Sequence, residues 1–306
     1  MNQVSRTVTV FTATYNRAHT LHRVYESLTA QTYKGFEWLI IDDGSTDGTR
    51  ELVAAWQQEA DFTIQYVWKE NEGKHIAINM AVRMVKTEYI VMLDSDDACV
   101  PNALERFEYH WNSIPESERS GYLSIEVLCQ YENGELVGDR FPDELEDSNL
   151  NEMRFRYRVR GEKWGSLRVV AIREAPFPES IKNTYVPEGI VWMRLSRLFK
   201  TRFVNEALRI YYVDQPSISR GSDRFRWDAT GYLMHHGAVL NDLVGYFNTA
   251  PWLLFRSAIN CSRYSFRQRI SLAQQIRNLH NGLARALWAA GLPAGYLLYL
   301  RDRLSK

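Results

Sequence analysis

Two short acidic stretches are the parts of this sequence best suited to chemistry. One occupies residues 42–47 and the other residues 94–97, and each directly follows an apolar run typical of a buried strand. Carboxylates spaced as in Asp94 and Asp96 can ligate one divalent ion, which can then bind a diphosphate that bare carboxylates would repel. The two stretches therefore predict a site for a cation and a phosphate-containing ligand.

The elements that must position these stretches follow from the hydrophobic pattern. Strand and helix patterns alternate, with strands at 8–14, 38–41, 63–68 and 89–93 and helices at 21–30, 48–58 and 75–85. This alternation predicts a parallel sheet covered by helices. Because ligands of open α/β sheets bind outside the carboxyl ends of the strands, we expect both acidic stretches at one edge of the sheet.

The pattern changes from about residue 121. We expect mixed strands and longer loops, in the order of a strand at 122–130, an Asn-Gly turn at 132–135, a strand at 167–173, a helix at 188–199 and a strand at 203–213. The chain then looks helical to its end. We place a boundary near residue 216, which separates a first domain of residues 1–216 from a helical region of residues 217–306.

Bulk composition excludes several classes of protein. The 37 Lys and Arg balance the 37 Asp and Glu, so the charge gives no indication of a nucleic-acid partner. The three cysteines, Cys99, Cys129 and Cys261, lie far apart, which argues against a disulfide framework or a zinc site. We find neither an apolar signal core nor an apolar run long enough for a membrane helix, and we expect a cytoplasmic protein.

Four motifs, taken together, resemble family 2 glycosyltransferases. They are Thr-Tyr-Asn-Arg at 14–17, the acidic run at 42–49, Gly-Lys-His-Ile-Ala-Ile-Asn at 73–79 and Asp-Ser-Asp-Asp at 94–97, and the likeness returns at 187–195. The resemblance implies the GT-A fold, a mixed α/β sheet flanked by helices. It also implies an inverting, metal-dependent enzyme that moves a sugar from a nucleotide-diphosphate donor, UDP-linked by preference, to a hydroxyl of a surface-glycan acceptor.

The resemblance assigns roles in donor binding to both acidic stretches. Asp96 would ligate Mn²⁺ or Mg²⁺ on the donor diphosphate, Asp94 would contact the ribose or the ion, and Ser95 lies between them. Asp42 or Asp43 would accept the imide N–H of uracil, and we favour Asp43. The alternative reading of each stretch is a polar turn that closes a strand.

Three residues at the end of the first strand, Thr12, Tyr15 and Asn16, should line the same nucleotide pocket, although Tyr15 could equally be a core residue. Lys74 stands at the start of a helix, where backbone N–H groups and its own charge favour an anion. Relatives often carry Arg before the Asn of this motif. Ile78 precedes Asn79 here, so Lys74 would replace that cation.

The general base is expected at the start of the helix near residue 188. Relatives use the Asp of a Glu-Asp pair, whereas this chain has Glu188 followed by Gly189. Glu188 could serve as the base if partial burial raises its pKa, or it could merely cap the helix. Trp164 and Trp192 could stack on sugar faces or belong to the core.

The last part of the chain is basic and rich in aromatic residues. Residues 251–306 carry nine Lys and Arg and one acid, Asp302. Such helices can lie on an anionic membrane surface, which would suit a polyprenyl-linked acceptor, or they can pack on the rest of the protein. A catalytically silent donor-binding subunit is the main rival function. A sugar nucleotidyltransferase ranks lower because residues 12–17 lack the glycines of a phosphate-binding loop.

Overall fold

The computed structural model describes residues 8–143, 147–214 and 229–304, and the chain divides into two compact units. The first unit takes in the described parts of 1–149, 159–183 and 198–217. The second takes in 150–158, 184–197 and the described part of 218–306. The boundary that we expected near residue 216 lies outside the described residues.

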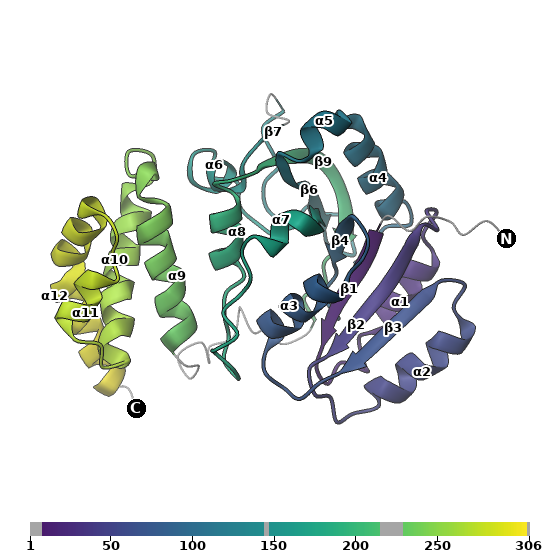
Figure 1. Ribbon diagram of the computed structural model, residues 1–306, viewed down its shortest axis with the longest axis horizontal. Helices are drawn as coiled ribbons and strands as arrows, with labels where there is room; N and C mark the ends of the chain where they lie inside the picture. The colour runs from purple at the N-terminus through teal and green to yellow at the C-terminus, as the bar shows by residue number, and fades with distance from the viewer. Residues whose placement is uncertain (1–7, 144–146, 215–228, 305–306) are drawn as a thin grey trace. The chain divides into compact units, whose positions relative to one another are not determined.

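A single mixed sheet forms the centre of the first unit (Figure 1). The strands lie in the order β3-β2-β1-β4-β8-β6-β9-β5, and β7 pairs with β9. Their bounds are β1 Val8–Thr14, β2 Phe36–Asp42, β3 Thr63–Trp68, β4 Tyr89–Met92, β5 Ala98–Cys99, β6 Tyr122–Gln130, β7 Asp147–Ser148, β8 Lys163–Arg168 and β9 Lys200–Ile210. Strands β1 to β4 are parallel to one another, as the alternation predicts.

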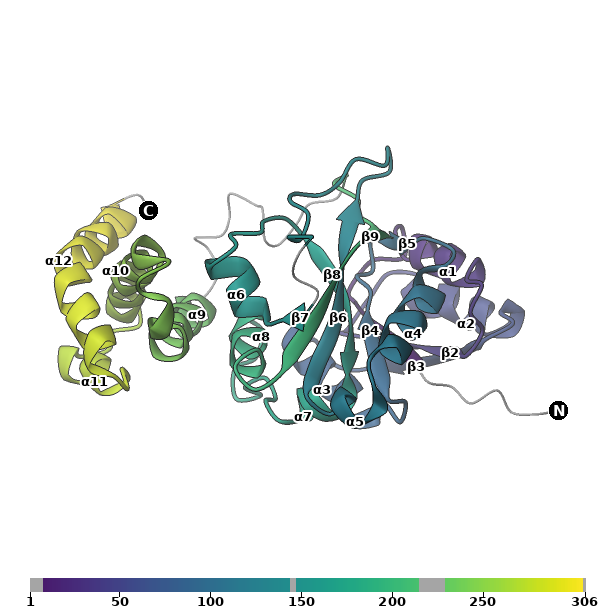
Figure 2. The ribbon, with the colours of Figure 1, turned by 90° about the horizontal axis from the view of Figure 1, so that it is seen from above.

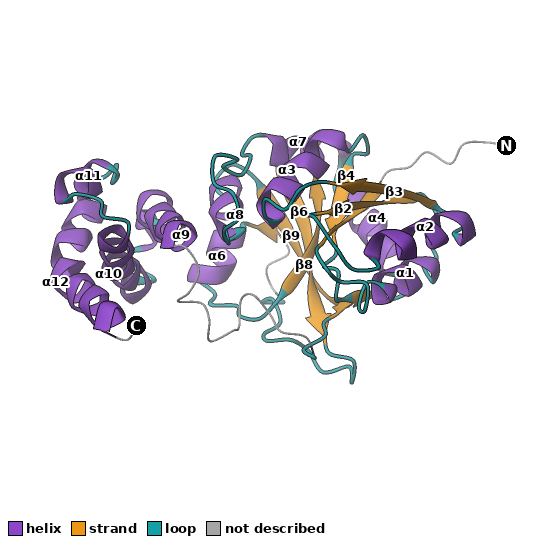
Figure 3. Cartoon of the chain, turned by 90° about the horizontal axis from the view of Figure 1, so that it is seen from below, coloured by secondary structure: helices purple, strands orange, loops and turns teal. Residues whose placement is uncertain are grey.

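Helices cover both faces of this sheet (Figure 3). Helices α1 (His22–Thr29), α2 (Thr49–Glu59) and α4 (Ala103–Ser113) share one core with the strands, and α3 (Lys74–Met84) and α7 (Val169–Arg173) lie on the other face. Helix α5 (Glu116–Arg119) is a single turn before β6. Aromatic rings fill the first core, where Tyr25 stacks on Trp56 with centroids 4.5 Å apart.

The expected strand at 167–173 is wrong. Strand β8 ends at Arg168, and the chain continues directly as helix α7. The antiparallel register pairs Arg168 with Tyr89, the first residue of β4, so the neighbouring strand offers no partner beyond this point. Because unpaired backbone groups must be satisfied in another way, the apolar run that follows forms a helix whose first N–H donates to the carbonyl of Glu88.

The second unit is helical in its described part (Figure 2). Its elements are α6 Leu150–Phe155, α8 Gly189–Leu195, α9 Ala229–Asp242, the 3₁₀ turn η2 Val244–Tyr246, α10 Pro251–Arg267, α11 Leu272–Arg277 and α12 Gly282–Leu304. Two small apolar clusters hold it together, one centred on Leu240, Ala258 and Trp288 and the other on Phe155, Met193 and Leu254. Within the described residues, no helix is both long enough and apolar enough to span a membrane.

Candidate functional site

The acidic stretches meet at one edge of the sheet, as predicted. Strand β1 lies between β2 and β4, and Thr14 at its carboxyl end pairs with Asp42 at the end of β2. The backbone N–H of Leu93 donates to Phe11, which brings the loop after β4 to the same edge. The loops that begin at residues 15, 43 and 93 therefore share this edge.

Asp42 and Asp43 differ in their access to a ligand. Asp42 is fully buried and accepts hydrogen bonds from the Ser45 N–H at 2.7 Å and the Tyr66 hydroxyl at 2.5 Å. Asp43 is 6% exposed. Its Oδ2 accepts from the Gly73 N–H at 2.8 Å, and its Oδ1 accepts from both the Lys69 ammonium and the Glu72 N–H. A carboxylate offers about four lone-pair sites, so Asp43 has one acceptor site beyond these three hydrogen bonds.

The loop after β1 is built around Asn16. Asn16 has a φ of 52°, a left-handed conformation that Asn tolerates better than most residues. Its N–H donates to the Ser45 hydroxyl and its side-chain oxygen accepts from the Thr46 N–H, both at 2.8 Å. Tyr15 beside it is 49% exposed, whereas Thr12 is fully buried and accepts a hydrogen bond from the Trp38 indole. Tyr15 is therefore not a core residue.

Asp94 is held between two cations. The Lys74 ammonium lies 2.7 Å from Oδ1, and Nη2 of Arg209 lies 2.6 Å from Oδ2. Desolvation favours the neutral acid, but Lys74 and Arg209 outweigh it and hold the pKa of Asp94 well below its usual range. Arg209 also binds Asp97, which is 2% exposed, so two cations balance two carboxylates.

Asp96 is different from its neighbours in the motif. Its backbone carbonyl accepts a hydrogen bond from Arg23, but among the described residues its partly buried carboxylate has no hydrogen bond or salt bridge. The described residues also contain no group of three His, Cys, Asp or Glu side chains that could hold a metal ion. A single free carboxylate fits a magnesium or manganese ion that takes its remaining oxygens from a diphosphate and water. Ser95, beside it, is 8% exposed.

One buried hydroxyl at this edge lacks a partner. Thr14 at the end of β1 is 2% exposed, and within the described part of the chain its Oγ1 makes no hydrogen bond. Buried polar atoms without a partner are uncommon in native proteins. The sequence reading did not select Thr14, although it lies directly opposite Asp42.

Helix α3 contributes Lys74 at its first position and Asn79 near its middle. Asn79 is 5% exposed. Its side-chain N–H groups donate to the carbonyl of Phe177 and the carboxylate of Glu179, and its side-chain oxygen accepts from the N–H of Phe177. These bonds tie the loop after α7 onto α3. His75 is buried and hydrogen-bonds the carbonyl of Ile181, which agrees with a packed histidine.

Glu188 belongs to the second unit and directly precedes helix α8. Its side chain makes no capping hydrogen bond to that helix. Next to it, a side chain could be added at Gly189 without a clash, because the nearest atom to an ideal Cβ is a ring carbon of His235 at 4.0 Å. Gly189 is therefore not required by packing.

Trp164 is a core residue, which is one of the two alternatives that the sequence left open. The structure buries it in the core of the first unit, where its indole N–H donates to the carbonyl of Met92 at 2.7 Å. A ring that is 3% exposed cannot stack on a sugar.

The sequence analysis did not identify two polar residues of the first unit. Arg209 on β9 reaches the acidic loop from a strand more than a hundred residues away. Glu126 on β6 lies across Gly165 of β8, and a Cβ added at Gly165 would stand 2.5 Å from Oε1 of Glu126. Burial raises the pKa of Glu126 to about 7. The available signal was a single acid or base within an apolar strand pattern.

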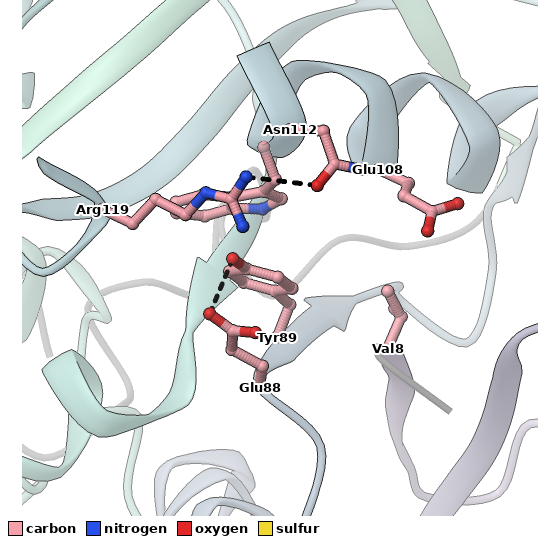
Figure 4. A pocket seen from close by; sticks show the side chains of 7 residues that line it. Val8, Glu88, Tyr89, Glu108, Asn112 and Arg119 are labelled. Carbon is pink, nitrogen blue, oxygen red and sulfur yellow. Dashed lines mark hydrogen bonds between the residues drawn. The ribbon is translucent and has the colours of Figure 1, made fainter. Parts of the chain in front are cut away.

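A small cavity of about 140 Å³ lies at the opposite, amino-terminal edge of β1 and β4 (Figure 4). Among its polar side chains, Tyr89 donates to Glu88 and Arg119 donates to Asn112, whereas Glu108 has no hydrogen bond or ion pair among the described residues. Tyr89 also stacks on Trp111 with centroids 4.3 Å apart. The cavity is therefore separate from the edge where the acidic stretches meet.

Comparison with known proteins finds a family model that matches the segment carrying the acidic stretches. Residues 9–116 match the model of glycosyl transferase family 2. An uncharacterized glycosyltransferase of Nostoc sp. is 34% identical over 99 residues, which cover 32% of this chain and 31% of that protein. A Rickettsia felis glycosyltransferase is 41% identical over 98 residues, covering 32% and 16%. These matches span less than half of the relatives' own length.

A longer match joins the chain to a Campylobacter jejuni protein named GalNAc(5)-diNAcBac-PP-undecaprenol beta-1,3-glucosyltransferase, which is 25% identical over 77% of this chain and 75% of its own. Among solved structures, Staphylococcus aureus TarS 1–349 in complex with UDP-GlcNAc aligns over 98% of this chain and 92% of its own, with a TM-score of 0.62 and 15% identity. The Pyrobaculum calidifontis mannosyltransferase PcManGT, with GDP-Man and Mn²⁺, covers 97% and 82% at a TM-score of 0.52 and 17% identity.

Proposed function

Residues 9–116 of this chain belong to glycosyl transferase family 2 and the structure has the GT-A fold, and from this premise we propose an inverting, metal-dependent glycosyltransferase that uses a UDP-sugar. The observation that carries the proposal is the edge where β1, β2 and β4 end. There, Asp43 is 6% exposed, and the Asp96 carboxylate has no hydrogen bond or salt bridge among the described residues; both lie within the segment that matches the family. A nucleotide-diphosphate donor needs both features.

Asp43 is the proposed acceptor for the imide N–H of uracil. Both aspartates could serve by type, but Asp42 is fully buried and Asp43 is not. The exposed ring of Tyr15 and the loop fixed by Asn16 would complete the nucleoside pocket. The S. aureus structure with UDP-GlcNAc makes a uridine donor a reasonable choice, although PcManGT was solved with GDP-Man.

Asp96 is the proposed protein ligand of the divalent ion. The ion, when bound, offsets the charge that develops on the leaving diphosphate. Lys74 is 48% exposed and sits at the amino end of α3, so its ammonium can turn from Asp94 toward a donor phosphate. Arg209 is buried and stays with Asp94 and Asp97.

Glu188 is the proposed general base. In an inverting displacement the acceptor oxygen forms a bond to the anomeric carbon as the bond to the diphosphate oxygen breaks, and the base takes the hydroxyl proton. Glu188 stands directly before α8 and makes no capping hydrogen bond to it, so we assign its carboxylate a chemical role and not a capping one. The usual Asp of the family is replaced by Gly189, so Glu188 would act without that neighbour.

The acceptor is proposed to be a hydroxyl of a surface glycan carried on a polyprenyl diphosphate. The name of the C. jejuni relative describes a glucosyltransferase acting on an undecaprenol-linked glycan, and the match covers most of both chains. Such an acceptor would place the enzyme at the cytoplasmic face of a membrane.

A screen of nucleotide sugars tests this function. Purified full-length chain is incubated with each donor and a polyprenyl-linked glycan, with and without Mn²⁺, and both nucleotide release and glycosylated product are measured. We expect one UDP-sugar to give both signals only with the metal. Tight donor binding without turnover on any acceptor would instead favour the donor-binding subunit, which the absence of Asp at position 189 also suggests.

A further inference from the structure

Helix α12 has an apolar face on each side. Its inner face, formed by Ala284, Trp288, Gly291 and Gly295, is buried. The contact with α10 is close, since a Cβ added to Gly295 would lie 2.1 Å from the Ser262 hydroxyl. Packing within the second unit therefore accounts for the inner face.

The outer face of α12 has no such partner among the described residues. It contains Ala286, Ala290, Pro293 and Leu297, which are exposed and follow one another at the three- and four-residue spacing of a helix face, and the exposed Leu304, which lies two turns beyond Leu297 on the same face. Leu297 is 66% exposed and Leu304 is 87% exposed. A helix whose outward side faces only water is normally polar on that side.

Arginines border this outer face. Arg285, Arg301 and Arg303 lie on α12 and are exposed. Residues 229–304 contain only two acids, and both are already paired: Asp242 with Arg197 and Asp302 with Arg263, each at 2.6 Å. Residues 229–304 therefore contain more basic than acidic side chains, and three of the basic ones lie on the helix that carries the apolar face.

We propose that the outer face of α12 docks on an anionic lipid bilayer, with the helix lying in the plane of the surface. The exposed leucines would enter the boundary between headgroups and acyl chains, and the arginines would contact lipid phosphates. Charge complementarity favours lipid over a second copy of the chain, because a symmetric contact would bring the same arginines together. The helix lies on the surface and does not cross it, in agreement with the absence of a spanning helix in the described residues.

The test uses the full-length chain and two kinds of vesicle. Co-sedimentation is measured with phosphatidylcholine vesicles and with vesicles that contain about a third phosphatidylglycerol. The double variant Leu297→Asp, Leu304→Asp should lower binding to the anionic vesicles by about tenfold or more, because it places charge in the apolar boundary. Leu198→Asp is the matched control, since Leu198 is 64% exposed but belongs to the first unit, and it should bind like the natural chain.

Binding should also fall as salt rises from about 0.1 M to about 0.5 M, since the Debye length shortens. Equal binding to neutral and anionic vesicles, or an unchanged double variant, would overturn the proposal. A third result would also overturn it: the natural chain does not bind vesicles, is a dimer by light scattering, and becomes a monomer in the double variant. That result would identify a second copy of the chain as the occupant of this face. The assay contains no donor or acceptor, so its result is independent of the proposed glycosyl transfer.

Discussion

Arg209 of β9 donates from Nη2 to the Asp94 carboxylate over 2.6 Å, so the last long strand of the sheet is tied directly to the acidic loop after β4. Arg209 is 7% exposed and also binds Asp97, which is 2% exposed. This arrangement removes Asp94 and Asp97 from the set of free carboxylates. Asp96 is the carboxylate of the motif that has no hydrogen bond or salt bridge in the part of the chain that the structure describes.

Replacing Arg209 should destabilise the first unit. Arg209→Met leaves the buried Asp97 without its cation, and breaking a buried ion pair costs about 3–5 kcal/mol of unfolding free energy. Arg106→Met is the control, because Arg106 pairs with Glu206 where both side chains are about a third exposed, and its loss should cost about 1 kcal/mol or less. Urea unfolding of both variants measures the difference. Equal costs would mean that Arg209 does not stabilise the loop.

Glu188→Gln should keep donor affinity but slow transfer. The change preserves shape and removes the proton acceptor, so we expect a loss of about two to four orders of magnitude in kcat. Turnover is measured with the donor and acceptor found in the screen, together with calorimetric UDP affinity. Near-normal turnover would exclude Glu188 as the base.

The second unit should lose stability in mild acid. Burial lowers the pKa of His235 to about 4 and that of His236 to about 3, whereas an unfolded histidine titrates near 6.5. Below about pH 6.5 the unfolded chain therefore binds more protons, and the free energy of unfolding falls as the pH drops toward the folded values. Well above about pH 6.5 these two histidines no longer make the free energy of unfolding depend on pH.

Thermal unfolding of the full chain between about pH 7.5 and pH 5 measures this dependence. His236→Gln should make the melting temperature fall less steeply with pH, because one titrating group is removed. The exposed His280 provides the control, and His280→Gln should leave the slope unchanged. Identical slopes in both variants would show that His236 does not couple to folding.

Close packing of α10 on α12 gives a further test. An added methyl at Gly295 would lie 2.6 Å from the carbonyl oxygen of Ile259 as well as against Ser262, so Gly295→Ala should cost about 1–3 kcal/mol. Gly237 on α9 has no atom within 4 Å of an ideal Cβ. Gly237→Ala should therefore be neutral or stabilise by about 1 kcal/mol through helix propensity. Chemical unfolding of the two variants should move in opposite directions, and a shared direction would contradict the helix contact.

The first half of the fold could be predicted because its signals are local. Strands β1 to β4 are apolar runs closed by turn residues, and the same turns carry the acidic stretches, so the strand pattern also placed these stretches at one edge of the sheet. The partners of those acids could not be predicted in this way. Arg209 and Lys74 reach Asp94 from opposite sides in sequence, and no periodicity links the three.

The second half was less predictable because long-range pairing decides it. Residues 169–173 have a strand-like composition but become α7 because β4 begins at Tyr89 and provides no further partner. The burial of Trp164 likewise depends on its bond to Met92, a contact across neighbouring strands. Residues 150–158 and 184–197 group with the C-terminal helices, which no change of composition marks.

Calorimetric binding of UDP with and without Mn²⁺ tests the central claim most directly. The natural chain should bind UDP only when the divalent ion is present, and Asp96→Ala should abolish that binding while keeping the melting temperature, because the Asp96 carboxylate makes no hydrogen bond or salt bridge among the described residues. Asp61→Ala, at an exposed carboxylate on the loop before β3, should bind normally. Undiminished UDP affinity in Asp96→Ala with Mn²⁺ present, or equal affinity of the natural chain without metal, would contradict the account.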